Sequence, residues 1–195
     1  FALLVKAESP IMSIQDLIAR SKAAPDTVSI GNEGPRSFGG IIARLVNARS
    51  GARANLVAYS NVGVAVQNVI GGQTDAVVAD VASTAQLVRQ GRLRMLAVTT
   101  GKRIPAWAQV PALAEVIPGF DMSGWFTLVA PTGTPATAIA RMHKEVNTLL
   151  ADKDMADRIL TVGPIAEPLA SPDAVAQFLK DEHQRWGAAA KEIGS

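Results

Sequence analysis

The chain of 195 residues is 48% hydrophobic and 18% charged, which excludes a disordered polymer and allows a core in one ordinary domain or two small lobes. Its formal net charge of +2 argues against a nucleic-acid binder, which usually carries a basic stripe. The sequence contains no cysteine, so disulfides, thiol nucleophiles and cysteine-ligated metals are excluded.

Short apolar runs alternate with amphipathic stretches through the first hundred residues. Strands are expected at 1–7, 28–30, 55–59, 75–79 and 93–99, and helices at 14–23, 39–49, 62–70 and 84–89. Ser13 is expected to cap the first helix, and Gly71-Gly72 to end the third. This alternation predicts a parallel sheet covered by helices, in which ligands bind beyond the carboxyl ends of the strands.

The pattern changes after Thr100. Residues 101–118 contain three prolines and are expected to form an irregular crossing segment. A strand is predicted next, followed by a tight turn and a helix that Thr134 caps, with Pro135 at its first position. Another helix is expected to begin at Pro172 behind the cap Ser171. The strand and the helix on either side of the tight turn are expected at 123–130 and 135–150, and a helix at 155–161 and a strand at 165–168 complete the predicted elements.

Five motifs follow one another along the chain. They are the Gly/Ser-rich loop at 31–40, Val57-Ala58-Tyr59, the turn Gly71-Gly72-Gln73-Thr74-Asp75, the strand sequence GRLRMLAVT at 91–99, and WFTLVAPTGTP from Trp125 to Pro135. Their order and spacing, over residues 1–195, resemble the substrate-binding receptors of tripartite tricarboxylate transporters, the Bug receptors. No single motif carries the resemblance, which lies in the whole series.

The resemblance implies an α/β fold of the type II periplasmic-binding-protein kind, with a parallel-rich sheet flanked by helices and a cleft between two lobes. Residues 1–118 then correspond to a complete α/β lobe, the second of the family, and residues 119–195 to the C-terminal part of the first lobe. The N-terminal half of that first lobe has no counterpart here. A clamp that lacks half of one wall is expected to bind ligand weakly, and its exposed apolar face to favour homo-oligomers.

The loop at 31–40, GNEGPRSFGG, is the first candidate for an anion site. Gly31 and Gly34 let the backbone approach a ligand closely, and Asn32 and Ser37 offer polar side chains. The N–H groups that open the following helix suit a carboxylate. A plain strand-to-helix loop has a similar composition, so the residues alone leave both interpretations open. Ser37 matches a hydroxyl position of the family.

Two positions of the same loop depart from the family pattern. Gly40 stands where many members have histidine, and Glu33 adds a negative charge where members often have a small residue. The identity of the ligand therefore does not follow from the resemblance.

Tyr59, Ser60, Asp80 and Trp125 complete the expected ligand-binding set. Tyr59 and Ser60 follow a strand and should face the cleft, although a core tyrosine before an exposed polar turn fits equally. Asp80 follows the next strand and could instead cap the helix after it. The acidic ligand-facing residue of the family matches the preceding position, Ala79. Trp125 could line the cleft or pack inside its lobe.

The residues make no positive case for an enzyme. His143 and His183 each lie in an expected amphipathic helix among charged residues, and neither belongs to a cluster with metal-ligand spacing. The glycines of the 31–40 loop match neither a dinucleotide-binding nor a phosphate-binding motif. No catalytic residue, metal or cofactor is therefore expected.

The resemblance implies a periplasmic receptor that captures a small carboxylate and presents it to the membrane permease subunits of a transporter. Dicarboxylates, tricarboxylates, amino acids and aromatic acids are the candidate ligands. Because Lys6 and Glu8 follow the first apolar residues at once, these residues are not expected to form a secretory leader. Two other interpretations stay open. An effector-binding domain of a transcription regulator would need a helix-turn-helix upstream, and an enzyme on this scaffold would need an acid–base pair.

Overall fold

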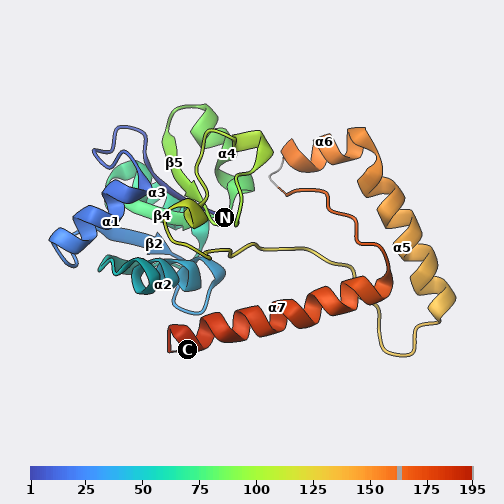
Figure 1. Ribbon diagram of the computed structural model, residues 1–195. Helices are drawn as coiled ribbons and strands as arrows, with labels where there is room; N and C mark the ends of the chain where they lie inside the picture. Colours follow the sequence, from blue (N-terminus) through green and yellow to red (C-terminus); the bar gives the residue numbers. More distant parts are fainter. Residues whose placement is uncertain (162–163, 195) are drawn as a thin grey trace. The chain divides into compact units, whose positions relative to one another are not determined.

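The computed structural model describes residues 1–161 and 164–194 (Figure 1). They divide into two compact units: unit 1 is Phe1–Gly124 together with the C-terminal residues from Ala189, and unit 2 is Trp125–Ala188. Within the described ranges, no helix combines the length and the apolar character that a membrane crossing requires.

Unit 1 is built on a five-stranded sheet with the strand order β3-β2-β4-β1-β5. The strands are β1 (Ala2–Lys6), β2 (Ser29–Asn32), β3 (Asn55–Ala58), β4 (Ala76–Ala79) and β5 (Leu93–Val98). β2 runs parallel to both β3 and β4, but β1 is antiparallel to β4 and β5. The parallel sheet predicted from the strand–helix alternation is therefore wrong at β1, whereas the parallel-rich sheet implied by the family resemblance is confirmed, because the other four strands share one direction. Strand β1 inserts between β4 and β5 instead of pairing with β2, the next strand in the chain.

Helices α1 (Ile14–Ala23), α2 (Phe38–Ser50), α3 (Val62–Gly71) and α4 (Val81–Arg89) flank this sheet. Gly39 of α2 packs on Val78, and Ala65 of α3 shares a core cluster with Val77. Because successive side chains of a strand point to opposite faces, α2 and α3 cover opposite faces of β4. The sheet is thus buried between two helical layers, with Leu3 and Leu4 of β1 fully inaccessible.

The local signals at the helix ends behave largely as expected. Ser13 caps α1, and Gly72 ends α3 in a left-handed conformation. Helix α4 begins at Val81 rather than Thr84, because Asp80 caps it.

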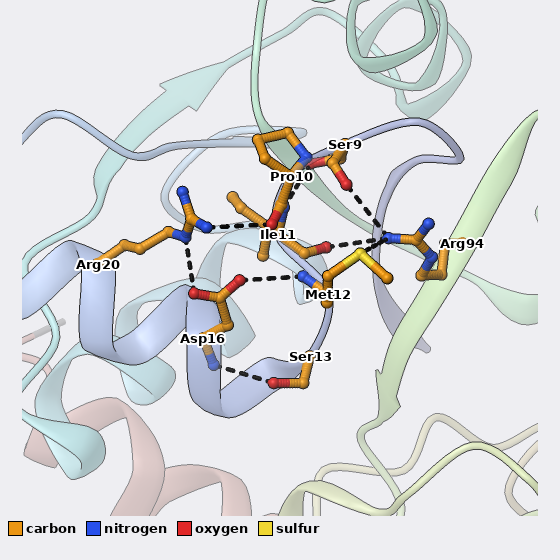
Figure 2. A network of polar contacts seen from close by, with 8 residues as sticks. All are labelled: Ser9, Pro10, Ile11, Met12, Ser13, Asp16, Arg20 and Arg94. Carbon is orange, nitrogen blue, oxygen red and sulfur yellow. Dashed lines mark hydrogen bonds and ion pairs between the residues drawn. The ribbon is translucent and has the colours of Figure 1, made fainter.

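The loop between β1 and α1 is fixed by polar contacts (Figure 2). Arg94 of β5 donates hydrogen bonds to the carbonyl oxygens of Ser9 and Ile11, each at 3.3 Å. Asp16 of α1 accepts the N–H of Met12 at 3.0 Å. The loop is thereby tied both to the sheet and to the helix that follows it.

Residues 99–124 leave β5 and return to the same end of the sheet. The irregular segment contains two short 3-10 turns, Pro105–Trp107 and Leu113–Glu115. The N–H of Met122 donates to the carbonyl oxygen of Thr99 at 2.8 Å, and the Thr99 N–H donates to the Phe1 carbonyl oxygen at 3.0 Å. The chain thus leaves unit 1 beside the place where β1 begins.

Unit 2 is made of α5 (Ala136–Ala151), α6 (Lys153–Thr161) and most of α7 (Pro172–Glu192). The Ser171 hydroxyl accepts the Ala174 N–H at 3.0 Å, which confirms the cap predicted for α7. The cap predicted for α5 is wrong: the Thr134 hydroxyl donates to the Pro131 carbonyl oxygen, and Pro135 takes the capping position without a side-chain bond.

The strands predicted at 123–130 and 165–168 do not form. A strand needs a neighbour for its N–H and C=O groups, and no described residue pairs with either segment. The side chains of Phe126 and Val129 are 93% and 79% exposed. Apolar composition alone therefore misled the prediction here.

Candidate functional site

Three helix N-termini meet at one edge of the unit 1 sheet. Strands β2, β3 and β4 run parallel, so their carboxyl ends lie at the same edge, and α2, α3 and α4 begin directly after them. Ser37 caps α2, Asn61 caps α3 and Asp80 caps α4. Helix N-termini carry partial positive charge and N–H groups without intrahelical acceptors, so the edge is suited to a negatively charged group.

The loop before α2 is held by its own hydrogen bonds. The Asn32 side-chain oxygen accepts the Gly34 N–H at 2.8 Å, and the Gly34 carbonyl oxygen accepts the Ser37 hydroxyl at 2.8 Å. The Ser37 oxygen in turn accepts the Gly40 N–H at 3.0 Å. Asn32 is only 3% exposed. Ser37 therefore fixes the first turn of α2, and its own proton is engaged within the loop.

Glycine is required twice in this loop. Gly34 has a φ of +105°, which side chains with a Cβ rarely adopt. A Cβ at Gly40 would lie 1.9 Å from the Gly34 carbonyl oxygen. This backbone consequently accommodates no side chain at position 40. Histidine, which many members of the family that the sequence resembles carry there, would not fit.

Tyr59 lies at the same edge, directly after the end of β3. Its N–H donates to the Asn32 carbonyl oxygen at 2.8 Å, which extends the β2–β3 pairing to the site. The Tyr59 ring packs on Gly31 of β2, where a Cβ would lie 3.2 Å from the ring. The absence of a side chain at residue 31 therefore makes room for the ring. Tyr59 also packs against the core, whereas Ser60 is exposed. The tyrosine thus belongs to the core and to the edge together.

Asp80 caps α4 with both of its carboxylate oxygens. Oδ1 accepts the Ser83 N–H and Oδ2 accepts the Ser83 hydroxyl, each at 2.7 Å. The Phe1 amino group lies nearby: burial lowers the pKa of that group, and the Asp80 charge partly opposes the decrease. The capping role that the sequence left open is therefore present, and it places a negative charge beside two helices with neutral caps.

An aromatic pair that was not predicted from the sequence lies at this edge. The rings of Phe1 and Phe38 stack with centroids 4.4 Å apart. A Cβ at Gly124 would lie 3.6 Å from the Phe38 ring and 3.7 Å from the Phe1 ring. Phe38 is the first residue of α2. Its position directly after the cap Ser37 was the sequence signal that could have placed it at the site.

Trp125 lies in unit 2, apart from the other seven candidates, which all belong to unit 1. Its Nε1–H donates to the Glu182 carboxylate at 2.8 Å, and its ring meets Phe178 edge-on at 5.6 Å between centroids. Arg185 donates to the same carboxylate at 2.7 Å. These contacts give Trp125 a packing role within unit 2.

The described residues contain no group of three or more metal-ligating side chains in reach of one ion. Both histidines of the sequence lie in unit 2, where the His143 Nε2 is 2.9 Å from the Leu169 carbonyl oxygen. The edge of unit 1 instead offers N–H donors and hydroxyls, together with the carboxylates of Asp80 at α4 and Glu33 in the loop before α2.

Sequence comparison matches residues 1–195 to the family described as Tripartite tricarboxylate transporter family receptor. Protein BugT of Bordetella pertussis is 31% identical over 195 residues, an alignment that covers 99% of this chain and 59% of BugT. The chain therefore spans well under two thirds of the length of this relative.

Solved structures give the same result. The R. palustris protein Rpa4515, determined with adipate, superposes with a TM-score of 0.86 at 27% identity, covering 99% of this chain and 64% of that one. The periplasmic binding protein BugD superposes with a TM-score of 0.81 at 24% identity, covering 99% and 65%. The chain has the α/β fold of these periplasmic binding proteins, as predicted, and it belongs to the tripartite tricarboxylate transporter receptor family.

Proposed function

We propose that this chain is the ligand-binding part of a periplasmic receptor that captures a small carboxylate. The convergence of α2, α3 and α4 at one edge of the sheet is the observation that carries the proposal. In α/β sheets, ligands bind beyond the carboxyl ends of the strands, where N–H groups at helix starts can hold an anion. Family membership supports the same reading, and the related Rpa4515 structure was determined with adipate.

The three caps divide the edge into two electrostatic regions. Ser37 and Asn61 are neutral, so these caps do not offset the positive ends of α2 and α3, whereas the Asp80 carboxylate offsets the positive end of α4. A ligand carboxylate is therefore favoured at α2 and α3, with the N–H groups of the first turn of α2 as donors. A hydroxyl or ammonium group is favoured beside Asp80, as in a hydroxy acid or an amino acid.

Seven of the expected site residues fit this arrangement as positioning or contact groups. Gly31, Asn32, Gly34 and Ser37 shape the α2 loop, whereas Tyr59, Ser60 and Asp80 border it. The ligand contact expected of Trp125, which lies in unit 2, stays a prediction. None of these site residues is assigned a catalytic role, in keeping with a family of receptors.

We further propose that unit 1 corresponds to one complete lobe of the receptor and unit 2 to part of the other lobe. The exposed apolar side chains of unit 2, among them Phe126, Leu128 and Val129, support a partial lobe whose core is unfilled. The same surface would favour homo-oligomers. Membrane permease subunits of a tripartite transporter are the proposed partners of the loaded receptor, in keeping with its membership of a transporter receptor family.

Amide chemical shifts of the 195-residue chain during titration test the ligand site even if affinity is only millimolar, about −4 kcal/mol. Adipate, malate and aspartate are the probes, and 1,6-hexanediamine, which has the carbon number of adipate but no carboxylate, is the control. We expect saturable shifts at Gly39, Gly40 and Asn61 with the acids alone. Absence of saturable shifts with every acid up to about 50 mM, or shifts centred elsewhere, would overturn the proposal.

Replacing Asp80 with asparagine tests the selectivity. The variant keeps an N-cap but removes the charge, so binding of adipate should strengthen about threefold to tenfold relative to aspartate. An unchanged ratio of the two affinities would show that Asp80 does not set the ligand class.

A further inference from the structure

The last residues of α7 belong to unit 1, although the rest of the helix belongs to unit 2. Residues 189–194, here named the C-terminal turn, lie in unit 1, whereas Pro172–Ala188 lie in unit 2. Ala189 is 2% exposed, so the turn is packed and not merely adjacent. Two arginines of α2 make further contacts with this turn.

Arg49 holds the C-terminal turn through a two-pronged ion pair. Its Nε donates to Glu192 Oε1 at 3.0 Å, and its Nη2 donates to Glu192 Oε2 at 2.8 Å. The guanidinium also lies 5.5 Å from the centroid of the Phe120 ring, and its Nη1 reaches the Gly119 carbonyl oxygen at 3.4 Å. Planar pairing of this kind fixes geometry as well as charge.

Arg44 adds a contact to the backbone of the same turn. Its Nη2 donates to the carbonyl oxygen of Ile193, just past the end of α7. The last carbonyl groups of a helix have no intrahelical donors and carry partial negative charge, so two cations from α2 stabilise this terminus. The pairing also raises the pKa of Arg49 and lowers that of Glu192, because each side chain hydrogen-bonds the charged form of the other.

The surface beside the turn is hollowed. An open hollow of about 410 Å³ lies between α2 and the turn, bordered by Asn47, Ala48 and Leu56 as well as by Glu192 and Ile193. The side chains of Arg49 and Glu192 remain 25% and 38% exposed. Beyond the packed Ala189, polar contacts therefore hold Glu192 and Ile193, and such contacts can be released.

Helix α2 carries both this anchor and the start of the proposed ligand site. Its N-terminus is capped by Ser37, whereas Arg44 and Arg49 lie in its second half. We propose that the C-terminal turn is a latch: docked on α2, it attaches unit 2 to unit 1 at a second place besides the 124–125 connection and steadies the helix that opens the ligand site. Only the effect on ligand affinity rests on the proposed function.

Distance measurements between two spin labels test the latch directly. The chain has no cysteine, so Gln86→Cys in unit 1 and Lys144→Cys in unit 2, both at exposed positions, give one label in each unit. In that background, Glu192→Gln removes the charge of the latch with little change in shape. We expect it to broaden the distribution of distances between the labels, and Arg49→Lys to broaden it less.

The matched control breaks an equivalent ion pair away from α7. Arg103 donates to both oxygens of Glu115, at 2.7 Å each, within unit 1. Glu115→Gln should therefore leave the distance distribution unchanged. Equal broadening by Glu115→Gln and Glu192→Gln, or no broadening by Glu192→Gln, would overturn the latch.

Ligand titration separates failure of the latch from failure of the proposed function. If adipate binds the parent chain, Glu192→Gln should weaken binding about twofold to tenfold, and Glu115→Gln should not. Equal affinities for the parent chain and Glu192→Gln would overturn the proposed effect on the site. If no acid binds the parent chain, the proposed function fails, and the distance measurements still decide whether the latch exists.

Discussion

Units 1 and 2 use similar amounts of helix but very different amounts of core. In unit 1, β1 and β4 are almost wholly buried between α2 and α3, whereas no residue of α5 or α6 is buried. Both units contain amphipathic helices with well-defined ends. The difference shows that local helix signals operate without a core, whereas strands and a shaped site appear only where a sheet can be completed.

The largest contrast is expected from one leucine in a helix of each unit. Leu45 of α2 is 0% exposed and Leu149 of α5 is 53% exposed. Leu45→Ala should lower the free energy of unfolding by about 2–5 kcal/mol, because it removes buried surface and leaves a cavity. Leu149→Ala should change it by about 0.5 kcal/mol or less. Urea unfolding followed by circular dichroism measures both.

A comparable loss from Leu149→Ala would mean that α5 is buried in solution. Dependence of that loss on protein concentration would then identify a second copy of the chain as the cover. The contrast between the units would in that case reflect assembly rather than sequence.

Two glycine-to-alanine substitutions should differ in sign. Gly40→Ala forces a Cβ toward the Gly34 carbonyl oxygen, so it should destabilise the chain by about 1–3 kcal/mol. Gly187→Ala, in α7 of unit 2, meets no atom within 4 Å and should stabilise by about 0.5–1 kcal/mol through helix propensity. Thermal unfolding of the two variants measures this difference. A neutral Gly40→Ala would show that the 31–40 loop has more than one accessible backbone.

The two serine caps offer a closer comparison. Ser37→Ala in unit 1 and Ser171→Ala in unit 2 each remove one bond to a helix N–H, so each should cost about 1 kcal/mol of stability. Only Ser37→Ala should also reduce carboxylate affinity, because Ser37 fixes the N–H groups proposed to hold the ligand. Calorimetry on both variants checks this, and equal affinities would remove Ser37 from the site.

The fold of unit 1 was largely predictable because several local signals agreed there. Apolar runs became strands, Ser13 and Gly72 set helix ends, and Asp80 proved to be a cap. The direction of β1 was not predictable, since pattern does not specify which strands become neighbours. The strand predicted at 123–130 did not form for a related reason: its composition suits a strand, but strand formation depends on a partner that composition does not reveal.

The location of the candidate site was predictable from the sequence, but the hydrogen bonds and ring contacts within it were not. The order of strands and helices put Asn32, Ser37, Tyr59 and Asp80 at one edge. The engagement of the Ser37 proton by the Gly34 carbonyl oxygen, and the stacking of Phe38 on Phe1, depend on backbone conformation and on contacts distant in sequence. Neither leaves a signal in residue spacing.

The smallest effects are expected from ion pairs, and here too the units should differ. Arg103 and Glu115 join segments twelve residues apart in unit 1, and hydrogen bonds from Arg103 lower the pKa of Glu115 to about 2. Lys153 and Asp157 pair within a single turn of α6, with side chains 86% and 60% exposed. Because the folded-state pKa of Glu115 lies below its unfolded value, its contribution to stability is present above the unfolded pKa and is lost as pH falls through the folded one.

Glu115→Gln should therefore be less stable than the parent chain at neutral pH, and the difference should shrink as pH falls from about 5 toward 2. Lys153→Gln should match the parent over the same range, because an exposed pair within one helix contributes little and Lys153 stays charged there. Urea unfolding at a series of pH values compares the three proteins. A difference for Glu115→Gln that is independent of pH would show that the ion pair does not contribute through its charge, and the contrast between the units would then rest on their cores alone.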